Sequence, residues 1–510
     1  MPIKIKDGAF PTDQVRRSLD ELPDTMDAST NPPDPNDLYV VLGHERALDP
    51  NSTLVVGDRG SGKSFWSAAL NSPVSRALIH AQLPRLQLDR VETSWGFSVS
   101  TRNADHPSRR VLQCLHGSHA AEDIWRAVVL RQLTSRYDEE LPGKDWAEIV
   151  AYVADNPERE ERLLSRIAGR LAADGKRHLV IFDALDRTGS DWKAIRALVR
   201  GLLQVCLDLK GQTGIQAKVF LRPDMWEDRS IWQFPDSSKL HHGRVILEWR
   251  RTDLYGLLWH WLCNHGEGAK MYRRWLQSKH HLSFTATEAD GAQVYPIPAK
   301  LRQDEDLQQA VLHDMATRYM GANRRRGRTY TWLPNHLADA KGQVSPRSFL
   351  IAVRDAQRET QARGHGEVLH WEGIKRGVQS ASSVRVQELR EDYPWIQTVL
   401  TPLNGQTVPC RDEDIMQRWE NAHTVQAIER DRTVTLSPEP FGSAEIDDER
   451  FYLPPHALAD RSSDTPEKAL IQELQRIGVI RRVDDDRVDI PDLFRVAAAI
   501  GRRGGVRPIR

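Results

Sequence analysis

Short, uninterrupted apolar runs alternate with amphipathic stretches over the first half of the chain. Residues 52–56, 178–182 and 217–221 form such runs, which are typical of strands buried on both faces of a sheet. Helices are expected over residues 65–70, 120–136, 145–173 and 192–209, and further strands over 90–98 and 245–249. Strands that alternate with helices predict an α/β fold, with a parallel sheet flanked by helices.

The pattern changes after residue 252, where strand-like runs give way to helical spacing. Helices are expected over residues 253–263, 306–319 and 345–360, and a mixed, mainly helical region follows. We therefore expect a helical subdomain after the sheet, which we call the lid subdomain.

One more helix is expected near the C-terminus. Asp464 and Thr465 can cap it, and Gly478 can end it. Residues 479–483 and 487–490 then form two strand-like runs around an acidic turn. A helix followed by a hairpin is the second half of a winged helix, although such units also occur in other small domains.

Composition narrows the class of protein without pointing to a ligand. Hydrophobic residues make up 39% and charged residues 28%, a mixture that can bury a core. Lys plus Arg equal Asp plus Glu at 71 each, so the net charge favours neither nucleic acid nor a membrane surface. The cysteines lack zinc-site spacing, and no apolar run approaches the ~20 residues that span a bilayer. We expect a cytoplasmic protein with reduced thiols and no membrane contact.

The strongest motif follows the first apolar run. It consists of Gly57, Asp58, Arg59, Gly60, Ser61, Gly62, Lys63 and Ser64. Glycines let the backbone curl so that its N–H groups point at phosphates, and the helix that follows adds its N-terminal partial charge. Lys63 can then neutralise the β and γ phosphates, and Ser64 can offer a hydroxyl to Mg²⁺. A strand before the loop and a helix after it make a chance match improbable. The motif predicts that the protein binds ATP with Mg²⁺.

A second motif lies at the end of the run 178–182. Asp183 is the candidate carboxylate on the metal side, because a carboxylate at a strand tip can hold Mg²⁺ through water. Asp186 can orient the attacking water or hold the metal from a second angle. The alternative for Asp186 is a helix cap before Trp192.

Two arginines are further candidates. Arg222 ends the run 217–221, and a strand-tip arginine in such a sheet can face the γ-phosphate; the alternative is a surface arginine at the sheet edge. Arg347 lies near the start of a predicted helix in the lid subdomain, where it can report the state of the nucleotide. The alternative for Arg347 is an ordinary helix N-terminus with proline in its first turn.

These motifs resemble those of one group of P-loop NTPases. The run Asp183-Ala-Leu-Asp-Arg187 is similar to the Asp-Asp-Leu-Asp-Arg sequence of KAP-type members, and the strand ending in Arg222-Pro223 resembles the sensor strand of STAND members. The resemblance covers roughly residues 38–360. It implies an additional-strand P-loop fold with the phosphate-loop strand central, and a nucleotide-driven switch. Many bacterial members act in anti-phage defence.

The sequence departs from this pattern at Ala184, which stands where the family carries a second acidic residue. This departure puts the catalytic base in doubt and is consistent with slow hydrolysis. A guanine-selecting Asn-Lys-x-Asp motif is absent, which favours ATP over GTP.

The chain is too long for one compact core, so several domains are expected. They are an irregular N-terminal lead-in (1–37), the P-loop NTPase core (38–250), the helical lid subdomain (251–362), a mixed, mainly helical region (363–460), and a winged-helix-like domain with a basic tail (461–510).

The first hypothesis is an ATP-hydrolysing switch or motor whose partners are copies of itself and a separate effector protein. The second is a DNA-binding regulator that uses ATP as a ligand with little turnover. It is motivated by the winged-helix pattern and by the arginines of the tail 501–510, which carries no acidic residue. The basic run 323–328 can contact phosphates or lie in a solvated loop. A phosphotransferase on the same loop is a weaker third hypothesis.

Overall fold

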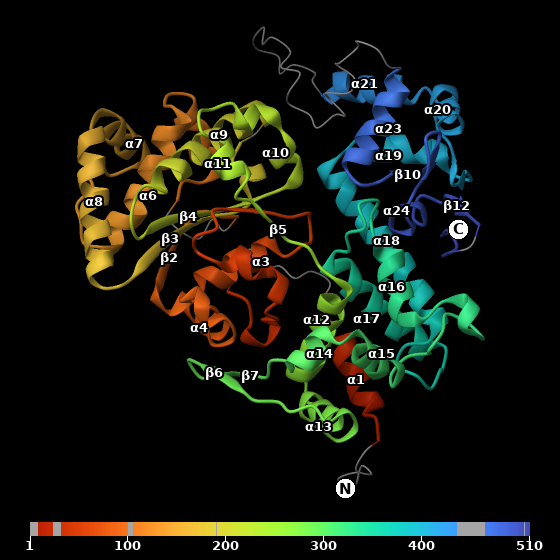
Figure 1. Cartoon of the computed structure of the whole chain (residues 1–510). Coiled ribbons are helices and arrows are strands. Elements are labelled where there is room, and N and C mark those ends of the chain that lie inside the picture. Colours follow the sequence, from red (N-terminus) through yellow and green to blue (C-terminus); the bar gives the residue numbers. More distant parts are fainter. Residues whose placement is uncertain are drawn as a thin grey trace. The chain divides into compact units, whose positions relative to one another are not determined.

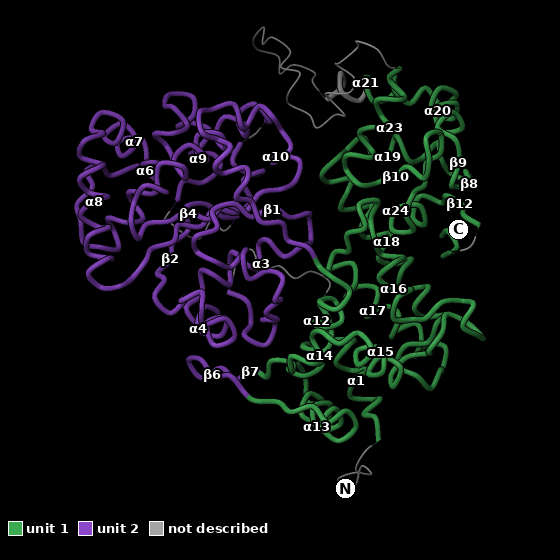
Figure 2. Tube along the Cα trace, viewed as in Figure 1, with its two compact units in different colours: residues 1–25, 249–285, 295–510 green, residues 26–248, 286–294 purple. Residues whose placement is uncertain are grey.

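The computed structural model describes residues 9–23, 32–99, 106–189, 191–435, 465–503 and 505–509. The chain forms two compact units (Figure 2). The sheet unit comprises residues 26–248 and 286–294, and the helical unit comprises residues 1–25, 249–285 and 295–510.

The sheet unit is built on a five-stranded sheet whose strands all run parallel, in the order β2-β3-β4-β1-β5. Its strands are β1 (Leu54–Val56), β2 (Val91–Phe97), β3 (Arg177–Phe182), β4 (Ile215–Leu221) and β5 (Val245–Ile246). The expected parallel α/β sheet is confirmed, with β4 inserted between β1 and β3. The phosphate-loop strand β1 was expected to be central. It is instead next to the edge of the sheet, and only the two-residue strand β5 lies beyond it.

Helices cover both faces of this sheet (Figure 1). They are α2 (Glu45–Leu48), α3 (Lys63–Asn71), α4 (Pro73–Gln82), α5 (Arg109–His116), α6 (Ala121–Arg136), α7 (Trp146–Asp155), α8 (Pro157–Ala173), α9 (Trp192–Leu209), α10 (Pro223–Glu227) and α11 (Ser238–His241). Helix α3 packs on β2, β3 and β4, and α6 and α9 pack on each other and on β2 and β4 from the opposite face. Trp125 of α6 lies edge-on to Phe182 of β3, with ring centroids 5.6 Å apart, inside the main apolar core.

The single helix expected over 145–173 is wrong, since α7 and α8 are separate. Asn156 leaves the helical conformation, with φ −131° and ψ 56°, and Pro157 opens α8. The residue before a proline is pushed out of the helical region by the proline ring, so the break is local in origin.

Two buried histidines of the sheet unit are not part of the phosphate-loop motif. His178 contacts the hydroxyls of Ser94 and Tyr137, each at 2.9 Å, and burial lowers its pKa to about 3. His44 accepts from the Trp66 indole at 3.1 Å, and burial lowers its pKa to about 4. Both rings are therefore neutral in the folded protein at neutral pH.

We predict that the free energy of unfolding falls as the pH drops below about 6.5. Both folded-state pKa values lie below the unfolded value, so the unfolded chain binds protons first and gains stability on acidification. Each histidine contributes about 1.4 kcal/mol per pH unit until its folded pKa is reached. Urea unfolding between pH 7 and pH 5 measures this slope. The variant His178→Gln should have a shallower slope, and the exposed-site variant His242→Gln should keep the wild-type slope.

A short hairpin from later in the sequence completes the sheet unit. Its strands β6 (Thr287–Ala289) and β7 (Ala292–Val294) are antiparallel, and β6 packs on α4.

The helical unit begins with α1, which lies inside the predicted irregular lead-in 1–37 and corrects that prediction. Its helices up to residue 400 are α1 (Thr12–Asp20), α12 (Arg251–Asn264), α13 (Ala269–His280), α14 (Ala299–Gln303), α15 (Glu305–His313), α16 (Thr329–Leu337), α17 (Pro346–Ala362), α18 (Trp371–Asp392) and α19 (Ile396–Leu400). Helix α1 buries only Val15, Ser18 and Leu19, a stripe too narrow to stand out in the sequence. It packs on α12 and α17.

Helix α15 is shorter than the expected helix 306–319. The chain leaves the helix after His313 because Ala316 forms a parallel bridge with Leu369 and Tyr319 an antiparallel bridge with Arg328. These bridges use backbone hydrogen-bonding groups that a longer helix would have used.

The C-terminal part of the helical unit contains the expected helix and hairpin. Its elements are α20 (Asp412–Asn421), α21 (Thr424–Thr435), α23 (Pro466–Arg476), α24 (Asp492–Arg495), β8 (Thr407–Val408), β9 (Cys410–Arg411), β10 (Arg481–Arg482), β11 (Arg487–Asp489) and β12 (Gly501–Arg502). Thr465 caps α23, and Gly478 after it has φ 78°; Asp464 lies outside the described residues. Strand β11 pairs with both β10 and β9. The winged-helix assignment itself stays a prediction.

The basic tail folds back on this region. Arg502 pairs with Asp489 at 3.0 Å, Val506 is buried, and Arg503 and Arg507 are exposed. In the part of the chain that the structure describes, no helix combines the length and apolar content needed to cross a membrane.

Candidate functional site

The phosphate-loop motif connects β1 to α3, and its glycines are required by the local backbone. Gly60 and Gly62 have φ values of 79° and 100°, in the left-handed region that favours glycine. A Cβ at Gly57 would lie 2.4 Å from the Ser61 Oγ and 3.2 Å from the Leu247 Cβ. The backbone therefore needs glycine at these positions of the motif.

Lys63 is the first residue of α3, and its ammonium lies inside the curled loop. Its Nζ donates to the carbonyl oxygens of Gly57 at 2.6 Å and Asp58 at 2.9 Å. Burial lowers the pKa of Lys63, and the carboxylate of Asp183 opposes that shift. The loop thus surrounds a single positive charge with backbone groups.

Asp183 follows β3 and connects the two sequence motifs. Its side chain is buried, and its Oδ2 accepts from the Ser67 hydroxyl at 3.1 Å. The Ser64 hydroxyl also hydrogen-bonds to this carboxylate, and burial raises the pKa of Asp183. The structure thus brings Lys63, Ser64 and Asp183 together at the carboxyl edge of the sheet, as the sequence predicted.

Asp186 and Arg222 reach the same edge from β3 and β4. Asp186 lies in the 3-10 turn Leu185–Arg187, and its Oδ2 is 3.5 Å from the Arg222 Nη1. Arg222 also forms a two-bonded pair with Asp224, at 3.2 and 3.0 Å. Asp186 does not cap the next helix, because Asp191 accepts from the Ala194 N–H there at 2.8 Å. The alternative of a helix cap for Asp186 is therefore wrong.

Ala184 adopts a left-handed conformation, with φ 55° and ψ 40°. Asp and Asn adopt this conformation more readily than Ala does. An acidic residue, as in the Asp-Asp-Leu-Asp-Arg sequence that this segment resembles, would thus suit the backbone better than the alanine of this chain. The Ala184 N–H also hydrogen-bonds to the Asp183 carboxylate, which helps fix that side chain.

Two contributors to the site were not predicted from the sequence. Ser67 donates to Asp183, and Asp224 holds the guanidinium of Arg222. Ser67 lies one helical turn after Lys63, so helical spacing from the motif could have indicated it. Asp224 could have been indicated by its position two residues after Arg222.

Arg347 belongs to the helical unit, where its guanidinium pairs with Glu388 at 2.6 Å. Its predicted role at the nucleotide stays a prediction. The basic run contains the 3-10 turn Arg324–Arg326, whose arginines are exposed.

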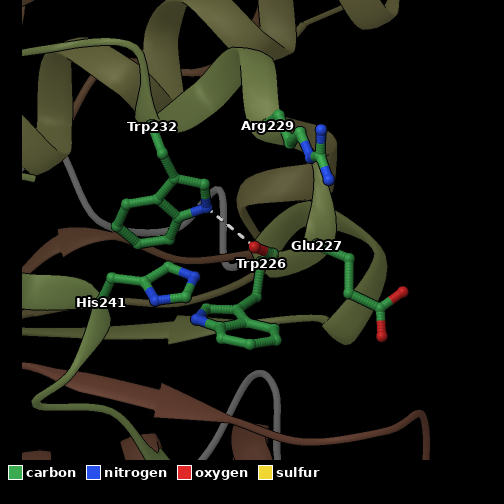
Figure 3. Close-up of a pocket in the computed structure, with 5 residues that line it drawn as sticks. All are labelled: Trp226, Glu227, Arg229, Trp232 and His241. Atoms are coloured by element: carbon green, nitrogen blue, oxygen red, sulfur yellow. Dashed lines mark hydrogen bonds between the residues drawn. The ribbon is translucent and has the colours of Figure 1, made fainter. Parts of the chain in front are cut away.

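A separate hollow of about 430 Å³ lies next to α10 and is lined by Trp226, Glu227, Arg229, Trp232 and His241 (Figure 3). The rings of Trp226 and His241 stack 4.5 Å apart, and the Trp232 indole N–H donates to the Trp226 carbonyl at 2.8 Å. None of the residues predicted to bind the nucleotide lines this hollow.

Comparisons with known proteins return only distant similarity. No protein-family model matches the sequence, and no curated protein matches it. The ORC2 protein of Aeropyrum pernix, in ADPNP–ADP complexes, is 11% identical with a TM-score of 0.31, over 93% of each chain. Cdc6p of Pyrobaculum aerophilum is 10% identical with a TM-score of 0.26, over 96% of this chain and 92% of that one. At these values the likeness carries no functional conclusion, which has to come from the site itself.

Proposed function

We propose that the sheet unit binds ATP with Mg²⁺ and hydrolyses it. The observation that carries the proposal is the meeting of Lys63 and Ser64 with Asp183, which come from two separate motifs. This arrangement suits a nucleoside triphosphate. It combines a lysine inside a glycine loop, the N-terminus of the helix that follows, and a buried carboxylate at a strand tip.

The loop residues fit the phosphates of the nucleotide. The positive φ angles of Gly60 and Gly62 curl the backbone into the shape in which consecutive N–H groups can face an anion. The Lys63 ammonium can exchange its two carbonyl acceptors for phosphate oxygens, which carry full negative charge and bind it more strongly.

The residues on the other side of Lys63 fit Mg²⁺, which prefers oxygen ligands. Ser64 and Asp183 offer a hydroxyl and a carboxylate that already contact each other. When bound there, Mg²⁺ would neutralise phosphate charge. The buried carboxylate of Asp183 has a raised pKa, so a nearby cation would favour its ionised form.

Asp186 is the proposed group that orients the attacking water and accepts its proton, with Arg222 beside it as the group that faces the γ-phosphate. We predict that Asp186→Asn binds ATP as tightly as the wild type while its turnover falls roughly 10²- to 10⁴-fold, because the amide cannot accept a proton. Phosphate release and ATP titration measure the two effects. The exposed-site variant Asp155→Asn should behave as the wild type, and normal turnover in Asp186→Asn would remove this assignment.

We further infer an ATP-driven switch or motor of the STAND/KAP-like branch, acting with copies of itself and an effector protein in a cytoplasmic regulatory or defence assembly. The Asp183-Ala-Leu-Asp-Arg187 and Arg222-Pro223 sequences support this branch. In this proposal Arg347 keeps the predicted role of reporting the nucleotide state.

A DNA-binding regulator is the second candidate, supported by the exposed Arg503 and Arg507 beside a helix and hairpin. Turnover measured with and without duplex DNA separates the candidates. Measurable turnover that DNA leaves unchanged favours the protein-triggered switch. ATP binding without turnover, together with DNA affinity, favours the regulator.

A further inference from the structure

Three potential metal ligands meet in the loop between α17 and α18, within the helical unit. The His365 Nε2 lies 3.1 Å and the His370 Nδ1 3.7 Å from the Glu372 Oε2. One ligand atom from each residue lies within 4.8 Å of the other two. Among the described residues, no other group of three or more His, Cys, Asp or Glu side chains meets this criterion.

These distances fit a tetrahedral metal site. Zinc bonds to nitrogen and oxygen are about 2 Å long, which places neighbouring ligand atoms roughly 3.3 Å apart. The two separations, 3.1 and 3.7 Å, lie on either side of that value. A dication could therefore reach all three groups once the two imidazole rings turn to point their nitrogens at it.

The backbone that carries the ligands is held in place from several sides. The buried Thr360 accepts from the His365 N–H through its carbonyl at 3.2 Å, and from the His370 N–H through its hydroxyl at 3.0 Å. Arg16 of α1 donates to the carbonyl oxygens of residues 365, 366 and 367 at 2.7, 3.2 and 2.7 Å. Preorganisation of this kind lowers the entropic cost of binding.

The helices on either side of the loop are packed tightly enough to fix its ends. A Cβ on Gly373 would lie 2.4 Å from the Ala356 carbonyl oxygen, and one on Gly377 would lie 2.0 Å from that of Ala352. Only glycine permits this approach of α18 to α17. The backbone position of Glu372, in the first turn of α18, is therefore fixed.

The cluster also has more hydrogen-bond acceptors than donors. A carboxylate offers only acceptors, and each neutral imidazole offers one acceptor nitrogen. The two imidazole rings stack with centroids 3.6 Å apart. The His370 Nδ1 accepts from the Glu372 N–H at 3.3 Å, so a dication bound to that nitrogen would replace this hydrogen bond, and its charge would be partly offset by the carboxylate. Because a metal lies in the plane of each imidazole that binds it, binding would turn the rings out of their parallel stack.

We propose that His365, His370 and Glu372 bind a transition-metal dication of the zinc type and fasten the α17–α18 connection. Two imidazole nitrogens and one carboxylate oxygen are a ligand set for Zn²⁺ and leave a fourth position for water. Mg²⁺ and Ca²⁺ prefer oxygen ligands alone and should not compete. This site is independent of the ATP proposal.

The test is a Zn²⁺ titration of the metal-stripped full-length protein in competition with a chromophoric chelator. We expect one site per chain, an affinity loss of roughly 10- to 100-fold or more in His365→Ala and Glu372→Gln, and no competition from excess Mg²⁺. Zn²⁺ should raise the melting temperature of the wild type but not of these variants, and EDTA should reverse the rise. Glu372→Gln keeps the side-chain shape, so it remains informative if His365→Ala folds poorly.

The matched control is His280→Ala, which removes a histidine paired with one carboxylate, Asp314 at 2.8 Å, outside the cluster. It should bind Zn²⁺ as the wild type does. Equal losses in His280→Ala and His365→Ala would identify adventitious binding and overturn the proposal. Unchanged Zn²⁺ affinity in both cluster variants, or no Zn²⁺ binding by the wild type, would overturn it as well.

Discussion

Lys63→Ala is expected to raise the Kd for Mg·ATP by about 100-fold or more. The ammonium makes two hydrogen bonds inside the loop, to Gly57 and Asp58, and phosphate oxygens would replace those acceptors. Hydrogen bonds to charged groups contribute about 1.5–3 kcal/mol each, and about 1.4 kcal/mol corresponds to a tenfold change in Kd. Two such bonds therefore correspond to at least two orders of magnitude. Isothermal titration with Mg·ATP measures the change.

The control for Lys63→Ala is Lys193→Ala, which makes the same substitution at an exposed position of α9. It should bind ATP as the wild type does. Since Lys63 is buried and bonded to the loop, melting temperatures of both variants must be compared. A folded Lys63→Ala protein that binds ATP with wild-type affinity would show that another part of the protein holds the nucleotide. The proposed function would then fail.

Asp183→Asn is expected to lower ATP turnover by at least roughly 10³-fold and to remove the dependence of ATP affinity on Mg²⁺. The amide keeps the shape of the side chain and its acceptor for Ser67, but it loses the charge that would hold the proposed Mg²⁺. A metal ion contributes several kcal/mol to stabilising charge on phosphoryl oxygens, and about 1.4 kcal/mol corresponds to a tenfold change in rate. Turnover assays and ATP titrations over a range of Mg²⁺ concentrations measure both effects.

This result separates the roles of the two aspartates. Asp183→Asn should change the response of binding to Mg²⁺, whereas Asp186→Asn should change turnover alone. An Asp183→Asn protein whose ATP affinity still rises with Mg²⁺ would contradict the metal assignment. The exposed-site variant Asp155→Asn serves both experiments as the control.

The parts of the site that could be predicted from sequence are those fixed by short segments. The glycine loop needs its residue types for local backbone reasons, and apolar runs identify β3 and β4 because both are buried. The parallel sheet then brings the ends of these strands to one edge. That is why the sequence predicts that Asp183 and Arg222 lie at the same edge as the phosphate loop.

The remaining features depend on contacts between distant segments. The residue pattern of a single sequence does not reveal which distant segments come into contact. Helix α1 forms because α12 and α17 cover its narrow apolar stripe, and α15 stops where the chain pairs with Leu369. The pairing of Arg347 with Glu388 joins residues far apart in the sequence. The cluster of His365, His370 and Glu372 is different, because its residues lie within eight positions of one another and depend on the local conformation before α18.

The division into units has a consequence for how the protein is made on the ribosome. The chain passes between the units four times, after residues 25, 248, 285 and 294. Helix α1 is synthesised before the sheet, yet its partners α12 and α17 emerge only after the five-stranded sheet is complete. The hairpin β6–β7 likewise reaches the sheet unit late, after α12 and α13. Domains usually fold one after another during synthesis, from the N-terminus onward. Here the nascent chain must keep α1 unpaired until α12 has been synthesised. An expression product that stops at residue 248 would lack the β6–β7 hairpin of the sheet unit and would leave α1 without its partners.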